Sequence, residues 1–388
     1  MSQRTVVFLA VALVVLLGLV IFGQRSGTAP SEADAALLPN LEAALGELER
    51  VTVVKANGET VATLEQRAES WVVADKHGYA ADTAKLRQAL TALAEARILE
   101  RKTANPELYD RLGVEDVTAS DAAGISVSFT APGVTLPAVI LGNAEGSSYR
   151  YARRAGEAQS YLIDRNPDVP RTAAQWVDSR IVDVRGDRVR EVTITHADGE
   201  VVRISKDSAE LANFDVAGVP EGRELSYPGV ANVIGNALRE LNLEDVEPAP
   251  ESAPENATTV EYRTFDGLVV RVTGTETDDG SWIMVEASAD ATPAADASPA
   301  DGAEPANGAG EADAGEADAG EAGDAGDGAE GGDGAGAAPA SAAPAADPSA
   351  EAARINDKVR GWRYKIAGYQ YDQMTRRMAD LLKPPPAA

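Results

Sequence analysis

Residues 51–73, VTVVKANGETVATLEQRAESWVV, contain the pattern that decides the fold. Valines alternate with other residues on either side of Asn57-Gly58, a dipeptide that favours a tight hairpin because both residues tolerate positive φ. Trp71 follows Gly58 after 13 residues, and counting back ten residues from it reaches Val61. We therefore predict a hairpin that turns at Gly58 and a third strand that pairs back onto it, with Trp71 packed across the sheet.

This spacing recurs twice further along the chain. Two other valines lie seven residues before a turn glycine, as Val51 does before Gly58: Val192 before Gly199, and Val260 before Gly267. A large aromatic residue again follows each glycine, at Phe214 and at Trp282. The recurrence predicts three related units, each built on a hairpin and a third strand.

An amphipathic helix is expected to complete each unit. Apolar residues are spaced at helical intervals with polar residues between them in residues 78–96, GYAADTAKLRQALTALAEA, and again in residues 226–241, SYPGVANVIGNALREL. A similar stripe lies in residues 368–382, GYQYDQMTRRMADLL, and is formed by Met374, Met378, Leu381 and Leu382. We expect one face of each helix to pack on a sheet.

The repeated pattern predicts an α+β fold of β-β-β-α units with antiparallel sheets. The predicted boundaries are 41–115 for the first unit, 116–185 for a connecting β-meander, 186–247 for the second unit, and 256–286 together with 354–383 for the third. The third unit is thus expected to be interrupted by a long insertion.

That insertion, residues 287–353, carries much of the negative charge of the protein. It contains 15 Asp and Glu and no Lys or Arg, so the formal charge of −27 leaves −27 + 15 = −12 for the rest of the chain. The insertion has almost no apolar side chain larger than alanine, and we expect a long disordered acidic loop because it cannot offset its ordering entropy. The acidic balance argues against nucleic acid as a partner.

The N-terminal residues 1–25 are predicted to be a membrane anchor. Val6 to Phe22 form a run of 17 residues without a charged side chain. As a helix this run would extend roughly 25 Å, just enough to cross the hydrocarbon core. Arg4 before the run favours an N-terminus in the cytoplasm and a body outside it. A cleaved signal peptide is the alternative, and residues 26–40 are expected to be a tether.

Few residues of the chain are suited to catalysis. There is no cysteine, which excludes thiol nucleophiles and thiolate metal sites, and the two histidines, His77 and His196, both lie in predicted turns. No zinc-ligand spacing, nucleophile elbow or phosphate-binding loop occurs, so we expect no cofactor, no metal and no nucleotide. A catalytic pair of carboxylates stays open, because 62 acidic residues make chance pairs inevitable.

One segment is a candidate binding patch. In residues 148–154, SYRYARR, strand alternation places Tyr149, Tyr151 and Arg153 on one face, with Arg154 at the end. Arginine forks and aromatic rings on one face are suited to an anionic or carbohydrate ligand. The alternative is a partly exposed hairpin strand without a ligand.

Several stretches in the same order resemble the domain-of-unknown-function family 4340 (DUF4340). They are ESWVVADKHGYAADTAKLRQALTALAEARILE at 69–100, TANPELYDRLGVED at 103–116, YRYARRAGEAQSYLID at 149–164, AAQWVDSRIVDV at 173–184 and GWRYKIAGYQYDQMTRRMADLL at 361–382. The family has no established activity, so the resemblance implies no catalytic residue. Its relatives are similar to auxiliary components of ABC-type transport systems, including exporters of the gliding-motility type.

The resemblance therefore implies a non-enzymatic accessory or binding subunit of an ABC-type transport system or another cell-envelope complex. Together with the anchor, it predicts a single-pass protein of the bacterial inner membrane with a periplasmic body. The expected partners are the inner membrane and other envelope or transporter subunits. A periplasmic carboxylate-dependent hydrolase acting on envelope glycans and a purely structural tether are the alternatives.

Overall fold

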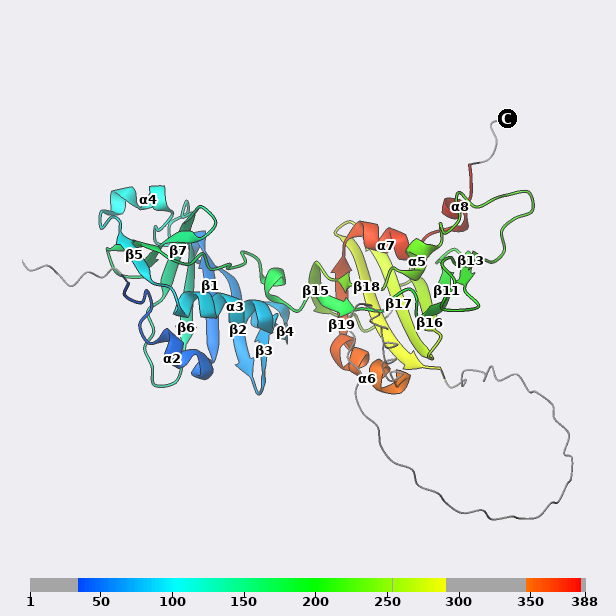
Figure 1. Ribbon diagram of the computed structural model, residues 1–388, viewed down its shortest axis with the longest axis horizontal. Coiled ribbons are helices and arrows are strands. Elements are labelled where there is room, and N and C mark those ends of the chain that lie inside the picture. Colours follow the sequence, from blue (N-terminus) through cyan, green and yellow to red (C-terminus); the bar gives the residue numbers. More distant parts are fainter. Residues whose placement is uncertain (1–33, 253, 291–346, 385–388) are drawn as a thin grey trace, which may run out of the picture.

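The computed structural model describes residues 34–252, 254–290 and 347–384, which form two antiparallel sheets with short helices packed on them (Figure 1). The α+β class with antiparallel sheets is thus confirmed. Among the described residues no helix is long and apolar enough to cross a membrane. The predicted anchor, Val6 to Phe22, lies outside the described residues.

The first sheet has nine strands in the order β4-β3-β2-β1-β6-β7-β8-β9-β5. Their bounds are β1 (Arg50–Lys55), β2 (Glu59–Arg67), β3 (Ser70–Val73), β4 (Tyr79–Ala80), β5 (Ile98–Arg101), β6 (Ile125–Thr130), β7 (Val139–Glu145), β8 (Tyr149–Arg154) and β9 (Ser160–Ile163). The predicted hairpin is β1 and β2, with Asn57 and Gly58 at positive φ in its turn. The predicted third strand is β3, which pairs with the end of β2.

The second sheet has eight strands in the order β13-β12-β11-β16-β17-β18-β19-β15. Their bounds are β11 (Val189–Thr195), β12 (Val201–Ser205), β13 (Asp215–Val216), β15 (Asp245–Pro248), β16 (Thr258–Thr264), β17 (Leu268–Thr277), β18 (Gly280–Ala289) and β19 (Trp362–Ile366). A separate pair, β10 (Arg180–Val182) and β14 (Leu241–Asn242), joins the connecting segment to the second half of the chain.

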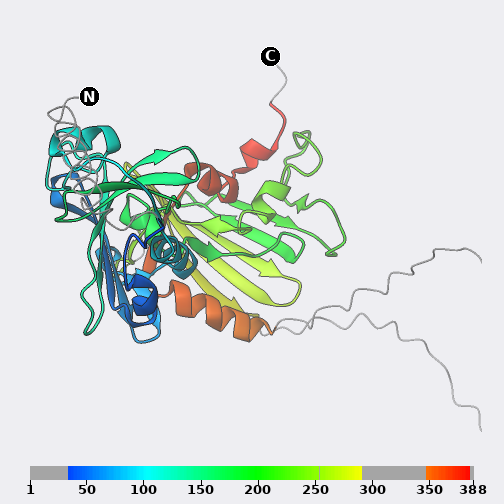
Figure 2. The same ribbon diagram turned by 60° about the vertical axis from the view of Figure 1, so that its left-hand side comes forward.

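The helices are short. They are α2 (Leu41–Ala44), α3 (Thr83–Ala94), α4 (Tyr109–Leu112), α5 (Asn232–Gly235), α6 (Pro348–Val359), α7 (Gly368–Met374) and α8 (Met378–Leu381). The 3₁₀ turns are η1 (Leu45–Glu47), η2 (Ala56–Gly58), η3 (Ala74–Lys76), η4 (Pro106–Leu108) and η5 (Ala173–Trp176). Figure 2 shows α6 lying along the strands of the second sheet, and α6 and α7 both contact β18.

The two sheets repeat one strand order. If β1, β2, β3, β5, β6, β7, β8 and β9 are matched in sequence to β11, β12, β13, β15, β16, β17, β18 and β19, the neighbours agree throughout, and β4 alone is extra. The structure therefore divides into two equivalent halves, and this replaces the three predicted units. The hairpin at Gly267 occupies the place of β6 and β7, because β16 pairs with β11 as β6 pairs with β1. The spacing of residues in a hairpin predicts where the chain turns, but it does not predict which strands of the sheet the hairpin supplies.

The predicted helices form to different extents. Asp82 caps α3 by accepting a hydrogen bond from the Lys85 amide, and the predicted apolar face is buried. In residues 226–241 only the single turn of α5 forms. Gly235 lies so close to Phe214 that a Cβ would approach its ring carbon Cε2 to 2.2 Å, and Tyr227 is 54% exposed. Close packing on Phe214 thus takes the place of a long amphipathic helix there.

Two predicted boundaries were wrong. The tether predicted for residues 26–40 is folded from Asp34 onward, because Leu37 and Leu38 are buried and the Leu37 amide donates to the Ala96 carbonyl. The predicted insertion, 287–353, is shorter at both ends. Strand β18 continues to Ala289, and α6 begins at Pro348 behind an Asp347 cap. The remainder of the predicted loop, 291–346, lies outside the described residues.

The halves meet at an aromatic contact. Tyr79 of β4 packs edge-on against Trp362 and Tyr364 of β19, with ring centroids 5.0 and 6.0 Å apart. Two ion pairs flank these rings, Lys76 with Asp245 at 2.5 Å and Lys358 with Asp178 at 2.7 Å. Buried apolar residues from both halves form one contiguous core.

Candidate functional site

A polar pocket of about 290 Å³ lies at one end of the second half. It is formed between the β11–β12 turn and the segment that contains α7 and α8. Its lining residues are His196, Thr258, Glu276, Tyr371, Asp372, Thr375, Arg376, Arg377 and Asp380. We call this cavity the His196 pocket.

Three buried polar side chains line this pocket. His196, Thr258 and Tyr371 are 5%, 9% and 6% exposed. Nδ1 of His196 lies 3.5 Å from Oγ1 of Thr258, whereas the buried Nε2 of the same ring has no hydrogen-bond partner. A buried polar atom without a partner costs free energy comparable to a lost hydrogen bond. The second imidazole nitrogen is therefore an unsatisfied buried atom beside the pocket.

Tyr371 reaches this site because its ring packs over a glycine of β17. A Cβ on Gly274 would approach Cε2 of Tyr371 to 2.6 Å, so only glycine accommodates the ring there. Gly274 is paired with Thr258 in the neighbouring strand, which brings the phenol and the threonine hydroxyl together. Burial raises the pKa of Tyr371 although a hydrogen bond with Thr258 opposes this, so the phenol is neutral at physiological pH.

Three charged side chains around the pocket are unpaired within the described part of the chain. Glu276, Asp372 and Arg376 line the cavity, and none of their side chains takes part in a hydrogen bond or ion pair with another described residue. Glu276 and Asp372 are exposed, whereas Arg376 is half-buried. The pocket therefore presents two carboxylates and one guanidinium that are free to bind another molecule.

Arg377 also lines the pocket, but its side chain is paired with acidic residues of the β11–β12 turn. Its guanidinium binds Glu200 and lies 2.8 Å from Asp198, while the Met378 amide donates to Glu200 at 2.9 Å. These hydrogen bonds to Glu200 and Asp198 raise the pKa of Arg377. The contacts fasten the β11–β12 turn to the start of α8 and thereby hold the two walls of the pocket together.

The two histidines differ from each other more than expected. His77 is exposed in a left-handed turn at φ 57°, as its turn context predicts. His196 also lies in a turn but is only 5% exposed, because it packs beside Thr258 of β16 and lines the pocket with Tyr371 of α7. The HADG turn signal was correct, but it carries no information about a distant covering segment.

The predicted patch on β8 is brought together only in part. Tyr149 is 43% exposed and Tyr151 is half-buried, with its hydroxyl donating to Glu145. Arg153 is only 3% exposed, and its three guanidinium nitrogens donate to the Val114 carbonyl, the Glu157 carbonyl and the Asp116 carboxylate.

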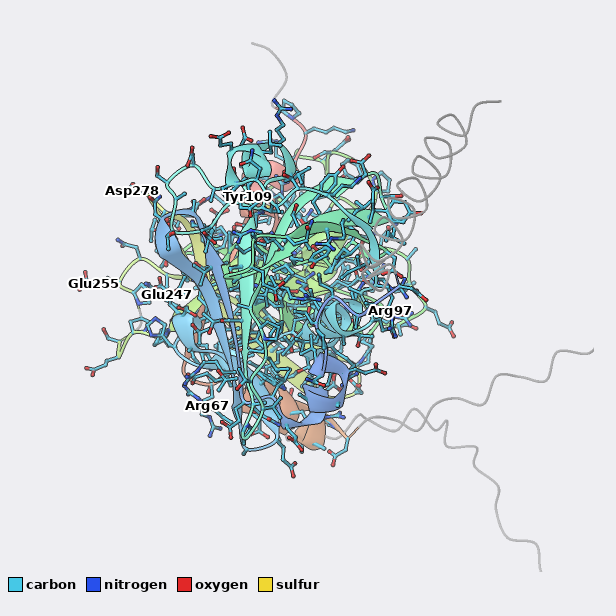
Figure 3. All side chains as sticks on the ribbon, turned by 90° about the vertical axis from the view of Figure 1, so that its left-hand side faces the viewer. Arg67, Arg97, Tyr109, Glu247, Glu255 and Asp278 are labelled. Atoms are coloured by element: carbon cyan, nitrogen blue, oxygen red, sulfur yellow. The ribbon has the colours of Figure 1, made fainter. Side chains whose placement is uncertain are left out.

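The two arginines of this patch stabilise the first half internally. The guanidinium of Arg153 also lies over the ring of Tyr109, which is labelled in Figure 3, with 4.7 Å to the centroid. Arg154 donates to the Leu37 carbonyl at 2.6 Å and binds Glu157 at 3.2 Å. Neither arginine is free to form the ligand fork that strand alternation suggested, because the segment after α4 binds Arg153 and the residues before α2 bind Arg154.

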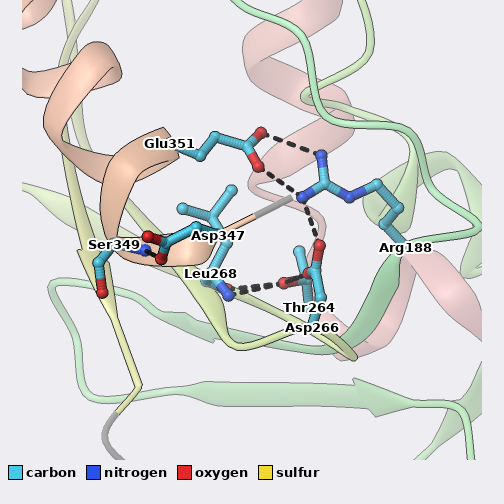
Figure 4. Close-up of polar contacts among 7 residues, drawn as sticks. All are labelled: Arg188, Thr264, Asp266, Leu268, Asp347, Ser349 and Glu351. Atoms are coloured by element: carbon cyan, nitrogen blue, oxygen red, sulfur yellow. Dashed lines mark hydrogen bonds and ion pairs between the residues drawn. The ribbon is translucent and has the colours of Figure 1, made fainter. Parts of the chain in front are cut away.

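A separate ion cluster fastens α6 to the second sheet. Arg188 binds Glu351 of α6 through two nitrogens, at 3.0 and 2.7 Å, and binds Asp266 of the β16–β17 turn at 2.7 Å (Figure 4). The hydrogen bonds to Glu351 and Asp266 raise the pKa of Arg188, and Thr264 donates to Asp266. The residues in this cluster satisfy one another, which indicates a structural role.

No group of three or more His, Cys, Asp or Glu side chains within the described residues is arranged to hold a metal ion. The main structural features of the described residues are the His196 pocket, an interface between two topologically equivalent halves, and the ion cluster that fastens α6. These features define a two-part antiparallel α+β protein with a polar pocket in its second half.

A family model described as "Domain of unknown function (DUF4340)" matches residues 71–260. These residues are therefore identified as a DUF4340 domain, and the predicted resemblance is confirmed. The match begins in β3 and ends in β16, so it includes His196 and Thr258 but not the α7 side of the pocket. No curated protein matches the chain, and no solved structure matches it.

Proposed function

We propose that this protein is a non-enzymatic binding or accessory subunit of a cell-envelope complex, such as an ABC-type transport system. In this proposal the apolar segment from Val6 to Phe22 holds it in the bacterial inner membrane, with the N-terminus in the cytoplasm and the two halves in the periplasm. The DUF4340 match supports the assignment, because relatives in that family are similar to auxiliary components of ABC-type transport systems.

The His196 pocket is the observation that carries the binding role. It joins a buried imidazole nitrogen without a partner to unpaired charges at its edge. A folded protein that only tethers other components gains nothing from a buried unsatisfied nitrogen, which costs about 1–3 kcal/mol. Of the four buried unsatisfied side-chain atoms among the described residues, only this one belongs to a residue that lines the pocket, where convergent polar groups are typical of a binding site.

The carboxylates of the described residues do not favour the alternative of a hydrolase. A glycosidase of the usual kind needs a carboxylic acid whose pKa is raised, usually by burial, opposite a second carboxylate. No Asp or Glu among the described residues is buried as a whole side chain. Hydrogen bonds donated by cations, backbone amides or, at Asp266, the Thr264 hydroxyl hold the carboxyl pKa low at Glu65, Asp198, Glu224, Glu261 and Asp266.

Site-specific crosslinking in intact cells tests the proposed function. A photoreactive amino acid at Tyr369, which is 65% exposed in α7 next to the pocket, should capture subunits of an envelope complex. The matched control places the same amino acid at Leu99, which is 44% exposed on β5 in the other half. Recovery of envelope subunits from the first site and not from the second supports the proposal. Identical captures, or none, contradict it.

A further inference from the structure

We propose that the His196 pocket binds a small zwitterion, a molecule that carries an ammonium group and a carboxylate a few bonds apart. A free amino acid and the end of a short peptide both have this chemistry. The inference rests on the proposed binding function and specifies the ligand class for the same site.

The size of the pocket limits the ligand. Pockets that enclose drug-sized ligands have volumes of roughly 300–1,000 Å³, and the His196 pocket, at about 290 Å³, lies at the lower end of that range. A nucleotide or an extended glycan would not be enclosed. An amino acid or a dipeptide is of the right size.

The charges around the pocket select both ends of such a molecule. Arg376 provides an unpaired guanidinium, whose planar fork matches the two oxygens of a carboxylate. Glu276 and Asp372 provide unpaired carboxylates that accept hydrogen bonds from an ammonium group. A simple anion would satisfy the arginine and leave both acids unpaired, whereas a simple amine would do the reverse. A zwitterion satisfies both.

The buried polar groups add further contacts. Nε2 of His196 has no hydrogen-bond partner, the hydroxyl of Thr258 lies 3.5 Å from Nδ1 of the same ring, and the phenol of Tyr371 forms a hydrogen bond with Thr258. These groups donate or accept hydrogen bonds but bring no full negative charge to the site. A metal ion does not fit as the occupant, because no metal-binding group of three acidic, His or Cys side chains exists among the described residues.

The first half of the chain offers an internal comparison. The residue that corresponds to His196, three positions before the turn glycine, is Lys55, which forms an ion pair with Glu59 at 2.8 Å. The amides of Asn57 and Gly58 in this turn donate to the Ala119 and Val117 carbonyls. A loop thus closes the end of the first hairpin, whereas the second hairpin borders a cavity. The binding site belongs to one half only.

Thermal denaturation of the full chain in detergent, with a panel of the twenty common amino acids and alanyl-alanine, tests the inference. We expect at least one member to raise the Tm in a saturable way. The best ligand is then compared with its amine, which lacks the carboxylate, and with its carboxylic acid, which lacks the ammonium group. Both analogues should bind at least tenfold more weakly. A preference for alanyl-alanine over alanine would identify a peptide end as the source.

The variant Arg376→Gln should weaken binding by about ten- to a hundredfold, the loss expected for one charge-assisted pair. The matched control is Arg360→Gln, which changes an exposed arginine outside the pocket and should bind as the unaltered chain does. No Tm increase with any member of the panel, or equal binding by Arg376→Gln, would overturn the inference. Zwitterion binding is measured on the purified chain, so its failure is distinguishable from a failure to capture envelope subunits in cells.

Discussion

The hydroxyl groups of Tyr79 and Tyr364 lie 3.5 Å apart, although the two residues are 285 positions apart and belong to different halves of the chain. Tyr364 in turn donates to the Lys358 carbonyl at 3.5 Å. Both phenols are buried, at 2% and 0% exposure. The contact between the halves thus contains a polar pair inside an aromatic cluster, and its protonation state affects how the halves hold together.

This pair predicts a loss of stability in alkali. Burial raises the pKa of Tyr79 to about 12. An exposed tyrosine in the unfolded chain ionises near 10, so the stabilisation is complete below pH 10 and is lost as the pH rises toward 12. The contribution of Tyr79 is about 3 kcal/mol for the two pKa units. Urea unfolding at pH 9 and pH 11.5 should show a smaller loss for Tyr79→Phe than for the unaltered chain.

The control for this experiment is Tyr149→Phe, because Tyr149 is 43% exposed on β8. Its alkaline loss should match that of the unaltered chain. If Tyr79→Phe also loses as much stability between the two pH values as the unaltered chain, the buried pair does not govern the contact.

The Arg188 cluster predicts that substitutions at Arg188, Asp266 and Glu351 have non-additive effects on stability. Replacement by leucine leaves Asp266 and Glu351 side by side without a cation and should lower the free energy of unfolding by about 2 kcal/mol, less than for a fully buried pair. The discount follows from the 30% exposure of Arg188 and 29% exposure of Asp266. Adding Asp266→Asn and Glu351→Gln to Arg188→Leu should recover part of this loss. If the losses in the free energy of unfolding simply add in the combined variant, the three residues do not act as one stabilising cluster.

Acid should weaken the same cluster. Burial alone would raise the pKa of Asp266, but hydrogen bonds from Thr264 and Arg188 outweigh burial and hold the pKa of Asp266 below its usual value. Stability from this carboxylate is therefore present above about pH 4 and decreases as the pH falls through the depressed pKa. In urea unfolding experiments, the free energy of unfolding of Arg188→Leu should decrease less on acidification than that of the unaltered chain. The control variant Arg360→Leu should show the same decrease as the unaltered chain.

Residues 291–346 are predicted to be dispensable for folding. The two ends of this segment come close together, because Asp290 and Pro348 each lie within 4 Å of the position that a Cβ on Gly267 would occupy. The Asp290 amide also donates to the Gly267 carbonyl at 2.7 Å. A short Gly/Ser linker should therefore join the ends without strain, and a roughly tenfold shorter loop should add up to about 2 kcal/mol of stability through loop entropy. A cooperative transition that disappears on deletion would contradict this.

Arg153 and Tyr149 should respond differently to substitution, although they lie on the same strand face. Arg153→Met removes donors from the Val114 and Glu157 carbonyls and should cost about 2–4 kcal/mol. Tyr149→Ala should stay within about 0.5 kcal/mol because the side chain is a surface one. The free energies of unfolding of both variants, measured by chemical denaturation, check these two expectations. Equal effects would restore the interpretation of this face as an open binding surface.

The sequence predicts local structure well where the signal is local. The turns at Gly58, Gly199 and Gly267 are hairpin turns as expected, and each of these glycines has the positive φ that its turn requires. The number of units could not be predicted in the same way. The order of the strands depends on which edge each hairpin joins, and no residue of the turn specifies that edge.

The candidate site is harder to predict for the same reason. His196 and Tyr371 come from opposite ends of the second half, and only the packing of α7 over Gly274 brings them together. Arg153 presents the opposite case, since strand alternation places it correctly on a face but cannot show that the segment after α4 covers that face. A glycine at position 274, within a strand that is mostly valine and threonine, was the available signal, because an isolated glycine in a strand often marks a close approach of another group.

The most direct test of the account observes the imidazole of His196 itself. The chain contains two histidines, and His77→Asn removes the other one at a left-handed position that asparagine tolerates. In the full chain labelled with ¹⁵N-histidine, Nε2 of His196 should then give a single resonance. We predict that this resonance shifts in a saturable way with the zwitterion that raises the Tm, and that the shift is absent with the amine and acid analogues. A resonance that stays in place at saturating zwitterion would contradict the assignment of the His196 pocket as a binding site.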